Sequence, residues 1–193
     1  MIAIDLDNTI IRYDRAFEAA AARLQCLPFG GPINKATVKT AAFAAGGNDL
    51  WTRLQGLAYG EEIARAEIFP GCVEFFAEAR EKLVIVSHKT RFPALGQPAD
   101  LREAARAFLA STPLAGTPVF FLDTREAKVA KLAELRPRAF IDDLPEVLQT
   151  PGFPPATAFH LFDPDNNHPS WSVSSRIRSW LEARSALSLS DEL

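Results

Sequence analysis

The chain of 193 residues is poor in cysteine and lacks a long apolar run. Cys26 and Cys72 form neither a CxxC pair nor a disulfide framework, so no zinc or redox motif is indicated and a reduced, cytoplasmic protein is predicted. No stretch approaches the roughly 18 consecutive apolar residues of a membrane span, so we expect no membrane association. The apolar start is also too short for a signal peptide and has no basic leader.

An excess of positive charge is lacking as well. The 21 Lys and Arg residues are balanced by 24 Asp and Glu, which gives a formal net charge of −3, and the basic residues form no run. A nucleic-acid-binding surface normally needs clustered Lys and Arg, so we expect no nucleic-acid partner. The hydrophobic share of 48% is ordinary for a globular core. The length predicts one domain, or one domain with a small inserted module.

The first nine residues carry the densest chemical signal in the sequence. Four apolar residues, Met1 to Ile4, lead into Asp5-Leu6-Asp7-Asn8-Thr9. This pattern predicts a short buried strand whose carboxyl end holds two aspartates on the same side. Carboxylates at the end of an apolar strand are costly to desolvate unless a metal, a cation or hydrogen bonds offset their charge. Taken alone, the stretch would also suit a solvated strand end followed by a turn.

Residues 14–69 are predicted to be helical throughout, with no strand pattern. Asn34 is a candidate N-cap, Gly46-Gly47 separates two helical stretches, and Trp51 and Tyr59 are expected to pack a small core. From residue 70 onward, short apolar segments alternate with helical ones. We expect helices at 71–81, 100–110, 125–135 and 172–186, and strands at 83–86, 119–122, 139–141 and 158–162.

Short, continuously apolar strands that alternate with helices indicate an α/β fold, a Rossmann-like parallel sheet covered by helices on both faces. In such sheets ligands gather at the carboxyl ends of the strands. Asp5 and Asp7, Ser87, and Asp142-Asp143 all follow the last apolar residue of a strand. We therefore expect these side chains to meet at one edge of the sheet.

Four short motifs follow one another along the chain at these positions. They are Ile4-Asp5-Leu6-Asp7-Asn8-Thr9, Ile85-Val86-Ser87-His88-Lys89, Lys128 in the first turn of the helix at 125–135, and Phe140-Ile141-Asp142-Asp143-Leu144-Pro145-Glu146. Their order resembles the motif set of the haloacid dehalogenase (HAD) superfamily, and the resemblance covers nearly the whole chain. It implies a core domain of residues 1–13 and 70–193 with a small α-helical cap, residues 14–69, inserted after the first strand.

The resemblance implies a Mg²⁺-dependent phosphomonoester hydrolase. Asp5 would be the nucleophile that forms an aspartyl-phosphate, and its other oxygen would bind the metal. Asp7 would act as general acid and base and would bind the metal through its backbone carbonyl. Asp142 would be a direct metal ligand, because Mg²⁺ prefers carboxylate oxygens.

The remaining motif residues would support this chemistry. Ser87, His88 and Lys128 would bind the phosphoryl oxygens, where a fixed donor and a cation stabilise the charge of the transition state. Thr9 and Asp143 would support these residues without contacting the phosphoryl group themselves. Asp143 would reach the metal through a water molecule or would orient Lys128. Taken without the other motifs, Asp142 and Asp143 could also be helix-capping residues.

Two details of the motifs bear on their interpretation. Lys131 competes with Lys128 as the motif lysine, although only Lys128 lies in the first turn, where a cation is unfavourable for the helix dipole and so hints at function. Position 8 is Asn where the family often has Gly, a variant associated with several phosphatase branches, nucleotidase-like ones included. Asp7 argues against dehalogenation, because the dehalogenases of the superfamily lack this second aspartate.

Substrate contacts are the least determined part of the prediction. In the family the cap closes over the site and selects the leaving group, and Lys35 and Arg53 are candidate contacts there, though surface solvation is the simpler role for each. Lys89 and Arg91 follow Ser87 directly and suggest a second anionic group on a small phosphorylated metabolite. The sequence indicates neither the identity of that metabolite nor the oligomeric state.

Two alternatives to a phosphatase share the same motifs. A phosphotransferase or phosphomutase would use the same aspartyl-phosphate chemistry with a second hydroxyl in place of water. A non-catalytic binding module would keep the fold alone. The intact set of Asp5, Asp7, Lys128 and Asp142 argues against the binding module, which would not need an acid and base at position 7.

Overall fold

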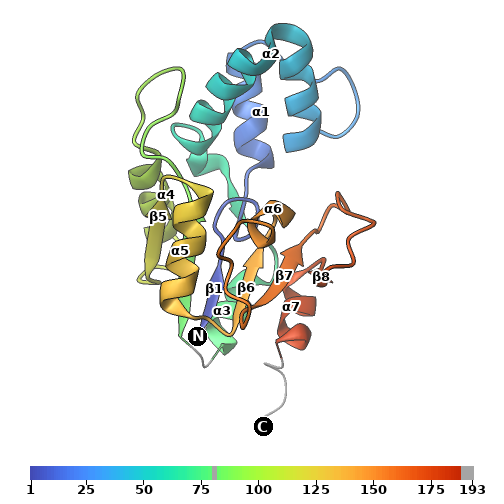
Figure 1. Ribbon diagram of the computed structural model, residues 1–193. Helices are drawn as coiled ribbons and strands as arrows, with labels where there is room; N and C mark the ends of the chain where they lie inside the picture. Colours follow the sequence, from blue (N-terminus) through green and yellow to red (C-terminus); the bar gives the residue numbers. More distant parts are fainter. Residues whose placement is uncertain (80–81, 188–193) are drawn as a thin grey trace. The chain divides into compact units, whose positions relative to one another are not determined.

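The computed structural model describes residues 1–79 and 82–187, and the chain divides into two compact units. The first, here the sheet unit, comprises Met1–Ile11, Ile68–His88 and Gly116–Leu193. The second, the helical unit, comprises Arg12–Glu67 and Lys89–Ala115 (Figure 1). Each unit is therefore assembled from segments that lie far apart in the sequence.

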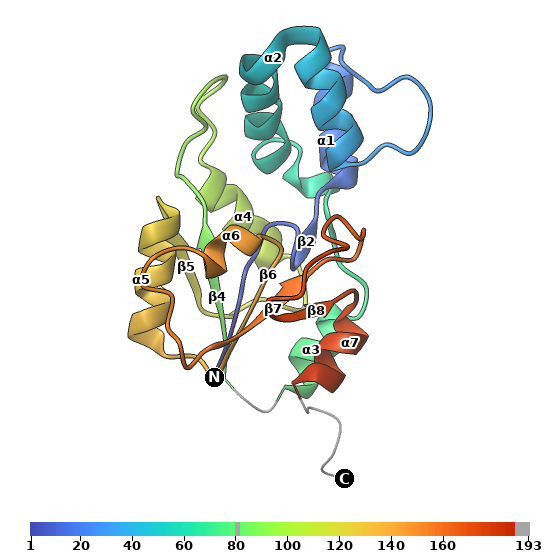
Figure 2. The same cartoon turned by 45° about the vertical axis from the view of Figure 1, so that its right-hand side comes forward.

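Within the described residues of the sheet unit, six strands form one sheet in which every neighbouring pair is parallel. Their order is β5-β4-β1-β6-β7-β8 (Figure 2). This confirms the predicted α/β class, since an all-parallel sheet needs helical crossovers between its strands. The strands are β1 (Ile2–Ile4), β4 (Leu83–His88), β5 (Val119–Leu122), β6 (Ala139–Asp142), β7 (Ala158–Phe162) and β8 (Ser175–Ile177).

One face of the sheet is covered by α5, Arg125–Leu135 (Figure 1). Val129 and Leu132 of this helix belong to a buried apolar cluster with Val84 and Phe140 of the strands. Because α5 follows β5 in a parallel sheet, the helix runs back along the sheet and begins at the carboxyl end of the strands. The first turn of α5 is thereby held at the edge where ligands are expected.

The opposite face is covered by α3 (Cys72–Glu78) and α7 (Trp180–Ala186), which pack against each other (Figure 2). The buried ring of Trp180 lies 4.8 Å from the ring of Phe75 and 5.5 Å from that of Phe162, between centroids. Aromatic packing of this kind adds to the free energy of apolar burial. The predicted helix at 71–81 is thus present in part, and its last two positions, 80 and 81, lie outside the described residues.

The strand registers align the carboxyl ends of the central strands. Ile4 pairs with Ile85 of β4 on one side and with Ile141 of β6 on the other. The backbone N–H of Asp5 donates to the carbonyl of Ile141 at 2.8 Å, which continues the ladder by one residue. Since Asp142 comes next after Ile141, carboxylates of two adjacent strands reach the same edge of the sheet.

The helical unit is built on α1 (Asp14–Arg23), α2 (Lys35–Tyr59) and α4 (Leu101–Ala110). Asn34 caps α2 as predicted, its side chain accepting from the N–H of Thr37 at 3.0 Å. The predicted break is present at Gly46-Gly47, where both residues leave helical geometry, but the helix resumes at once. In the described ranges no helix, the 25-residue α2 included, is long and apolar enough to cross a membrane.

Aromatic rings form the core of the helical unit. Trp51 stacks on Phe17 with 5.4 Å between ring centroids, and Tyr59 meets Tyr13 edge-on at 4.8 Å. This confirms the packing role predicted for the tryptophan and the tyrosine. Lys89–Ala115, which the sequence suggested as part of the core domain, belongs by its contacts to this unit, because α4 packs against α2.

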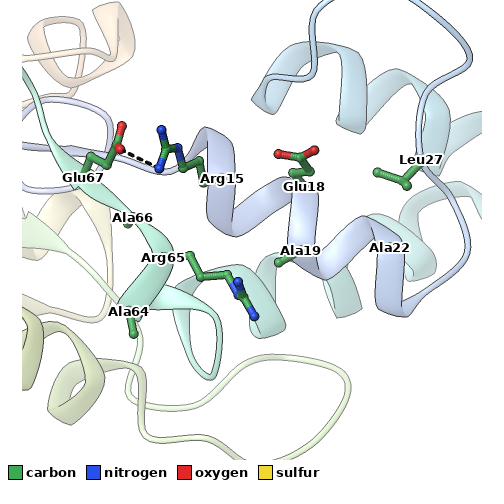
Figure 3. A pocket seen from close by; sticks show the side chains of 9 residues that line it. All are labelled: Arg15, Glu18, Ala19, Ala22, Leu27, Ala64, Arg65, Ala66 and Glu67. Carbon is green, nitrogen blue, oxygen red and sulfur yellow. Dashed lines mark ion pairs between the residues drawn. The ribbon is translucent and has the colours of Figure 1, made fainter.

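An open cavity of about 620 Å³ lies beside α1 within the helical unit. Four charged side chains and several alanines line it, and Arg15 forms an ion pair with Glu67 at 3.2 Å (Figure 3). None of the predicted site residues is among its lining residues, so the cavity is separate from the predicted chemistry.

The prediction of one helix over 172–186 was wrong in its first half. Residues Ser175–Ile177 form the edge strand β8, and the helix begins only at Trp180. Ile177 is buried, and Arg176 lies 3.3 Å from the carboxylate of Asp163 at the end of β7, so tertiary contacts hold this segment extended. The sequence did carry the helix start, because Ser179 caps it by accepting from the N–H of Glu182.

The prediction of helix throughout 14–69 was wrong near its end. Only a 3₁₀ turn forms at Ile63–Arg65, and Glu67–Ile68 forms the short strand β3, which pairs with β2 (Ile11–Arg12). Strands of two residues are too short to show the alternation of apolar and polar residues by which a strand is predicted from sequence. Its formation depends on β2, a partner more than 50 residues earlier in the chain.

We predict an acid sensitivity that originates at His160 of β7. This side chain is buried, its Nδ1 has no hydrogen-bond partner among the described residues, and burial together with the charge of Arg138 lowers its pKa below 6.5. The folded state therefore binds fewer protons than the unfolded state, so the stability that His160 provides above pH 6.5 is lost as the pH falls below that value. Chemical denaturation of His160→Leu at several pH values should show a shallower decline than the native chain, with His168→Gln as the control. A decline of equal steepness in the leucine variant would contradict this.

Candidate active site

A lysine ammonium joins the carboxylates of two adjacent strands. Nζ of Lys128, on α5, donates to Oδ1 of Asp5 at 2.5 Å and to Oδ2 of Asp142 at 2.7 Å. All three side chains are almost completely buried. Buried charges are tolerated only when they are paired and hydrogen-bonded, and the lysine meets this condition for both carboxylates. The contact joins Lys128 to Asp5 across 123 positions of the chain.

The charges of this group are not balanced. Burial has the largest effect on Asp5, and together with the charges of Asp142 and Asp7 it raises the pKa of that carboxyl to about 7 against the lowering effect of Lys128. For the lysine, burial would lower the pKa, but the two carboxylates outweigh it and raise the pKa, so the ammonium stays charged. The single positive charge of Lys128 therefore cannot neutralise all of the carboxylates around it.

The surplus of carboxylate oxygen suits a hard cation. Asp5, Asp142 and Asp143 each offer one ligand atom, and these atoms lie within 4.8 Å of one another. An all-oxygen donor set is what Mg²⁺ prefers, and the buried, incompletely neutralised charge at Asp5 would be offset by such an ion. The residues present therefore fit a divalent metal. Asp143 was expected only as a supporting residue, yet its carboxylate belongs to this same acidic group.

Two buried hydroxyl groups at the same end of the sheet lack a partner. Oγ of Ser87 and Oγ1 of Thr9 are both inaccessible to solvent and form no hydrogen bond with the described residues. Ser87 lies two residues beyond Ile85, the β4 partner of Ile4. A buried hydroxyl without a partner costs roughly 1–3 kcal/mol, so such groups commonly mark a place for a ligand or water. Phosphoryl oxygens would supply the missing acceptors.

The turn after β1 explains the residue at position 8. Asn8 has a φ of 64°, in the left-handed region, and its N–H donates to the carbonyl of Ile11 at 2.8 Å. Glycine is favoured there, and asparagine is among the few other residues that tolerate this conformation. Asparagine in place of glycine at this position thus leaves the turn geometry intact. Asp7, half-buried, lies within the turn and bridges to Ile11.

The far end of the turn is held by a residue that sequence reasoning missed. Nε1 of Trp180 donates to the backbone carbonyl of Thr9 at 3.2 Å, across 171 positions of the chain. The indole ring is fully buried on the α7 side of the sheet, so it fixes the loop that carries the aspartates. No local signal could have shown this contact, because a tryptophan at helical spacing indicates only core packing.

The structure distinguishes the two candidate lysines. Lys128 faces the strand ends, whereas Lys131 forms an ion pair with Glu134 on its own helix and lies over the ring of Phe120 at 4.9 Å. Only the first of the two can reach Asp5, because the three-residue step turns the second toward the edge strand. The preference for Lys128 agrees with this geometry.

His88, the other predicted phosphate contact on β4, is exposed at the strand end. Its ring Nε2 lies 3.1 Å from the backbone carbonyl of Asp123, just before α5. A carbonyl can only accept, so Nε2 carries the proton in this contact. The contact ties the end of β4 to the beginning of α5.

The predicted substrate residues lie in the helical unit. Lys89 is buried with its ammonium 4.7 Å above the ring of Tyr59, whereas Arg91 is exposed and pairs with Asp100 at 2.8 Å. Lys35 is half-buried at the start of α2, and Arg53 is exposed on that helix.

The fold is similar to that of several solved structures. A haloacid dehalogenase-like hydrolase from Streptococcus pneumoniae matches with a TM-score of 0.63 at 11% identity, over 96% of this chain and 97% of that one. A HAD family hydrolase from Deinococcus radiodurans, with bound phosphate and sodium, matches with a TM-score of 0.57 at 14% identity, over 97% and 94%. A CbbY variant from Rhodobacter sphaeroides, in complex with xylulose-(1,5)bisphosphate, matches with a TM-score of 0.57 at 13% identity, over 94% of each chain.

These similarities show the fold that the sequence motifs had suggested. The chain has the HAD fold, a parallel α/β sheet flanked by helices, along almost its whole length. No protein-family model matches the sequence, and no similar curated protein was found.

We predict that Lys128→Met strongly destabilises the metal-free protein. The substitution leaves two buried carboxylates without their cation, and removing one partner of a buried ion pair costs about 3–5 kcal/mol. Urea unfolding at pH 8 with a chelator should show this loss in the free energy of unfolding. The matched control is Lys131→Met, which removes an ion pair at the surface and should cost less than about 1 kcal/mol. Equal losses in the two variants would contradict the bridging role of Lys128.

Proposed function

We propose that this chain is a hydrolase of the HAD superfamily and that it hydrolyses the phosphomonoester of a small metabolite in a Mg²⁺-dependent reaction. The observation that carries the proposal is the buried contact of Lys128 with both Asp5 and Asp142 at the carboxyl edge of the sheet. The two unpartnered hydroxyl groups, on Ser87 and Thr9, support it. Ligands of parallel α/β sheets bind at this edge.

Each residue of the site has a place in such a reaction. Mg²⁺ held by Asp5, Asp142 and the backbone carbonyl of Asp7, with Asp143 in the same acidic group, would neutralise the phosphoryl oxygens and so lower their repulsion of an anionic nucleophile. Lys128 adds a second positive charge that is fixed before the substrate arrives. The hydroxyl of Ser87 donates a hydrogen bond to a phosphoryl oxygen.

Two aspartates then divide the covalent chemistry. A carboxylate oxygen of Asp5 attacks phosphorus, the ester P–O bond breaks, and the carboxyl group of Asp7 gives its proton to the departing alcohol oxygen. In the second step the Asp7 carboxylate takes a proton from a water molecule, whose oxygen attacks phosphorus while the bond to Asp5 breaks. Inorganic phosphate leaves, and both aspartates return to their starting states.

Two of the similar structures agree with this substrate class. One contains phosphate, and the other is a complex with a sugar bisphosphate. Their low identity to this chain leaves the substrate to be found by experiment, since a fold does not fix a substrate.

Hydrolysis of p-nitrophenyl phosphate tests the proposal. We expect turnover by the native chain with Mg²⁺, little turnover with a chelator, and none by Asp5→Asn, which cannot form the aspartyl-phosphate. Asp165→Asn, a change of the same type on an exposed residue of the sheet unit, should keep full activity.

An inactive native chain would require a second measurement, because an enzyme that is selective for its own substrate does not turn over a generic aryl ester. Beryllium fluoride with Mg²⁺ mimics an aspartyl-phosphate, and its binding can be followed by calorimetry. Metal-dependent binding that is lost in Asp5→Asn would support the proposed site. No such binding, or turnover that survives Asp5→Asn, would overturn the catalytic proposal.

We further expect Lys89 to affect affinity more than Arg91. Lys89 is buried beside aromatic rings and is nearer to Ser87 in the chain, whereas Arg91 is exposed and pairs with Asp100. If the substrate carries a second anionic group, Lys89→Ala should raise KM by about tenfold, the effect of losing about 1.4 kcal/mol of binding, and Arg91→Ala should raise it less. Steady-state kinetics on the best substrate of a metabolite screen provides the check. An unchanged KM in Lys89→Ala would refute this assignment.

A further inference from the structure

The sheet-facing side of α5 begins with an arginine that none of the motifs includes. Lys128, Val129 and Leu132 are the buried residues of this helix. Arg125 stands three and four positions before the first two of them, so it lies on the same face, one turn nearer the helix start. The side that packs on the sheet thus presents two cations, and both stand at its amino-terminal end.

Arg125 differs from the other half-buried arginines of the described chain. Those arginines are Arg12, Arg102, Arg176 and Arg184, and each donates to, or pairs with, a neighbouring group. Arg125 has no hydrogen bond or ion pair with any described residue, and its Nε is inaccessible to solvent and unpartnered. A buried guanidinium N–H without an acceptor is costly, because charged donors lose strong hydration.

The position of Arg125 adds a second cost. It is the first residue of α5, where the positive end of the helix dipole disfavours a cation. Glu126, the carboxylate next to it in the chain, forms no hydrogen bond with the guanidinium. It accepts from its own backbone N–H and from the hydroxyl of Thr124, and the charges of Arg125 and His88 act on it more weakly. A cation without a hydrogen-bonded counter-ion among the described residues therefore stands one helical turn before Lys128, which meets Asp5.

From these observations we infer that Arg125 is a specificity-determining residue that binds a second anionic group of the substrate, next to the phosphoryl group at Lys128. The inference rests on the proposed function and deepens it. A guanidinium binds carboxylate or phosphate oxygens through parallel N–H donors, and the half-buried guanidinium of Arg125 has no such acceptor among the described residues.

The helix geometry restricts the kind of substrate. The Cβ atoms of Arg125 and Lys128 lie roughly 5–6 Å apart on the helix surface. A second anion that is separated from the phosphate by a few bonds can then reach the guanidinium. The substrate class is a short-chain phosphate monoester with a carboxylate or a second phosphate near the ester.

A pair of compounds with one carbon skeleton tests this. Glycerol 3-phosphate and 3-phosphoglycerate differ only in that a carboxylate replaces a hydroxymethyl group. Calorimetric binding is measured with Mg²⁺ on the Asp5→Asn chain, and hydrolysis is measured with Asp5 intact. We expect Arg125→Gln to weaken 3-phosphoglycerate binding by about 10- to 100-fold, the range for a charge-assisted hydrogen bond, with a loss for glycerol 3-phosphate at least about tenfold smaller.

Two variants on the same helix are the controls. Arg136→Gln removes a charge at the other end of α5 and should leave both affinities unchanged. Glu126→Gln removes the neighbouring carboxylate and should tighten 3-phosphoglycerate binding by about two- to fivefold, the effect of an exposed charge pair.

The outcomes separate this inference from the proposed function. Equal losses for the two compounds in Arg125→Gln would show a general or structural role and overturn the inference. It would also be overturned if 3-phosphoglycerate bound no tighter than glycerol 3-phosphate. If 3-phosphoglycerate binds more tightly than glycerol 3-phosphate in a manner that depends on Arg125, but neither is hydrolysed, the anion site is supported and the phosphatase function is rejected. If both esters are hydrolysed at equal rates, the phosphatase function is supported and the anion site at Arg125 is rejected.

Discussion

The contact of Lys128 with Asp5 and Asp142 is the interaction on which the rest of the site depends. Three ionisable groups are taken out of water together, which is tolerable only because Lys128 lies at hydrogen-bond distance from both carboxylates. The contact requires β1, β6 and α5 to be placed accurately, since the lysine reaches both strand ends at once. The same contact fixes the carboxylates before any ligand binds, so little reorganisation is needed on binding.

The site remains incomplete without further charges. The raised pKa of Asp5 reflects burial and surplus carboxylate, and the acidic group formed with Asp143 gives a cation somewhere to bind. Among the described residues, the hydroxyls of Ser87 and Thr9 and the guanidinium of Arg125 have no hydrogen-bond acceptor. A surplus of negative charge beside unsatisfied donors is an arrangement that a metal and a phosphate together would complete.

The sequence predicted the fold well wherever a segment interacts mainly with itself. The apolar runs at β1, β4 and β6, the cap at Asn34 and the break at Gly46-Gly47 were all local signals, and all are present in the structure. The misses were of another kind. β8 and β3 are short strands held extended by distant partners, such as the pairing of Arg176 with Asp163, and no local period could reveal them.

For this protein the sequence by itself determined which residues stand at the strand ends, because apolar runs and the residues that stop them are local properties. It therefore determined that Asp5, Ser87 and Asp142 would share one edge of a parallel sheet. Only the tertiary structure decided that Lys128 and not Lys131 joins them, and that Trp180 holds the turn at Thr9. The orientation of a helix and contacts across most of the chain arise from packing, and packing is not written in any short stretch of sequence.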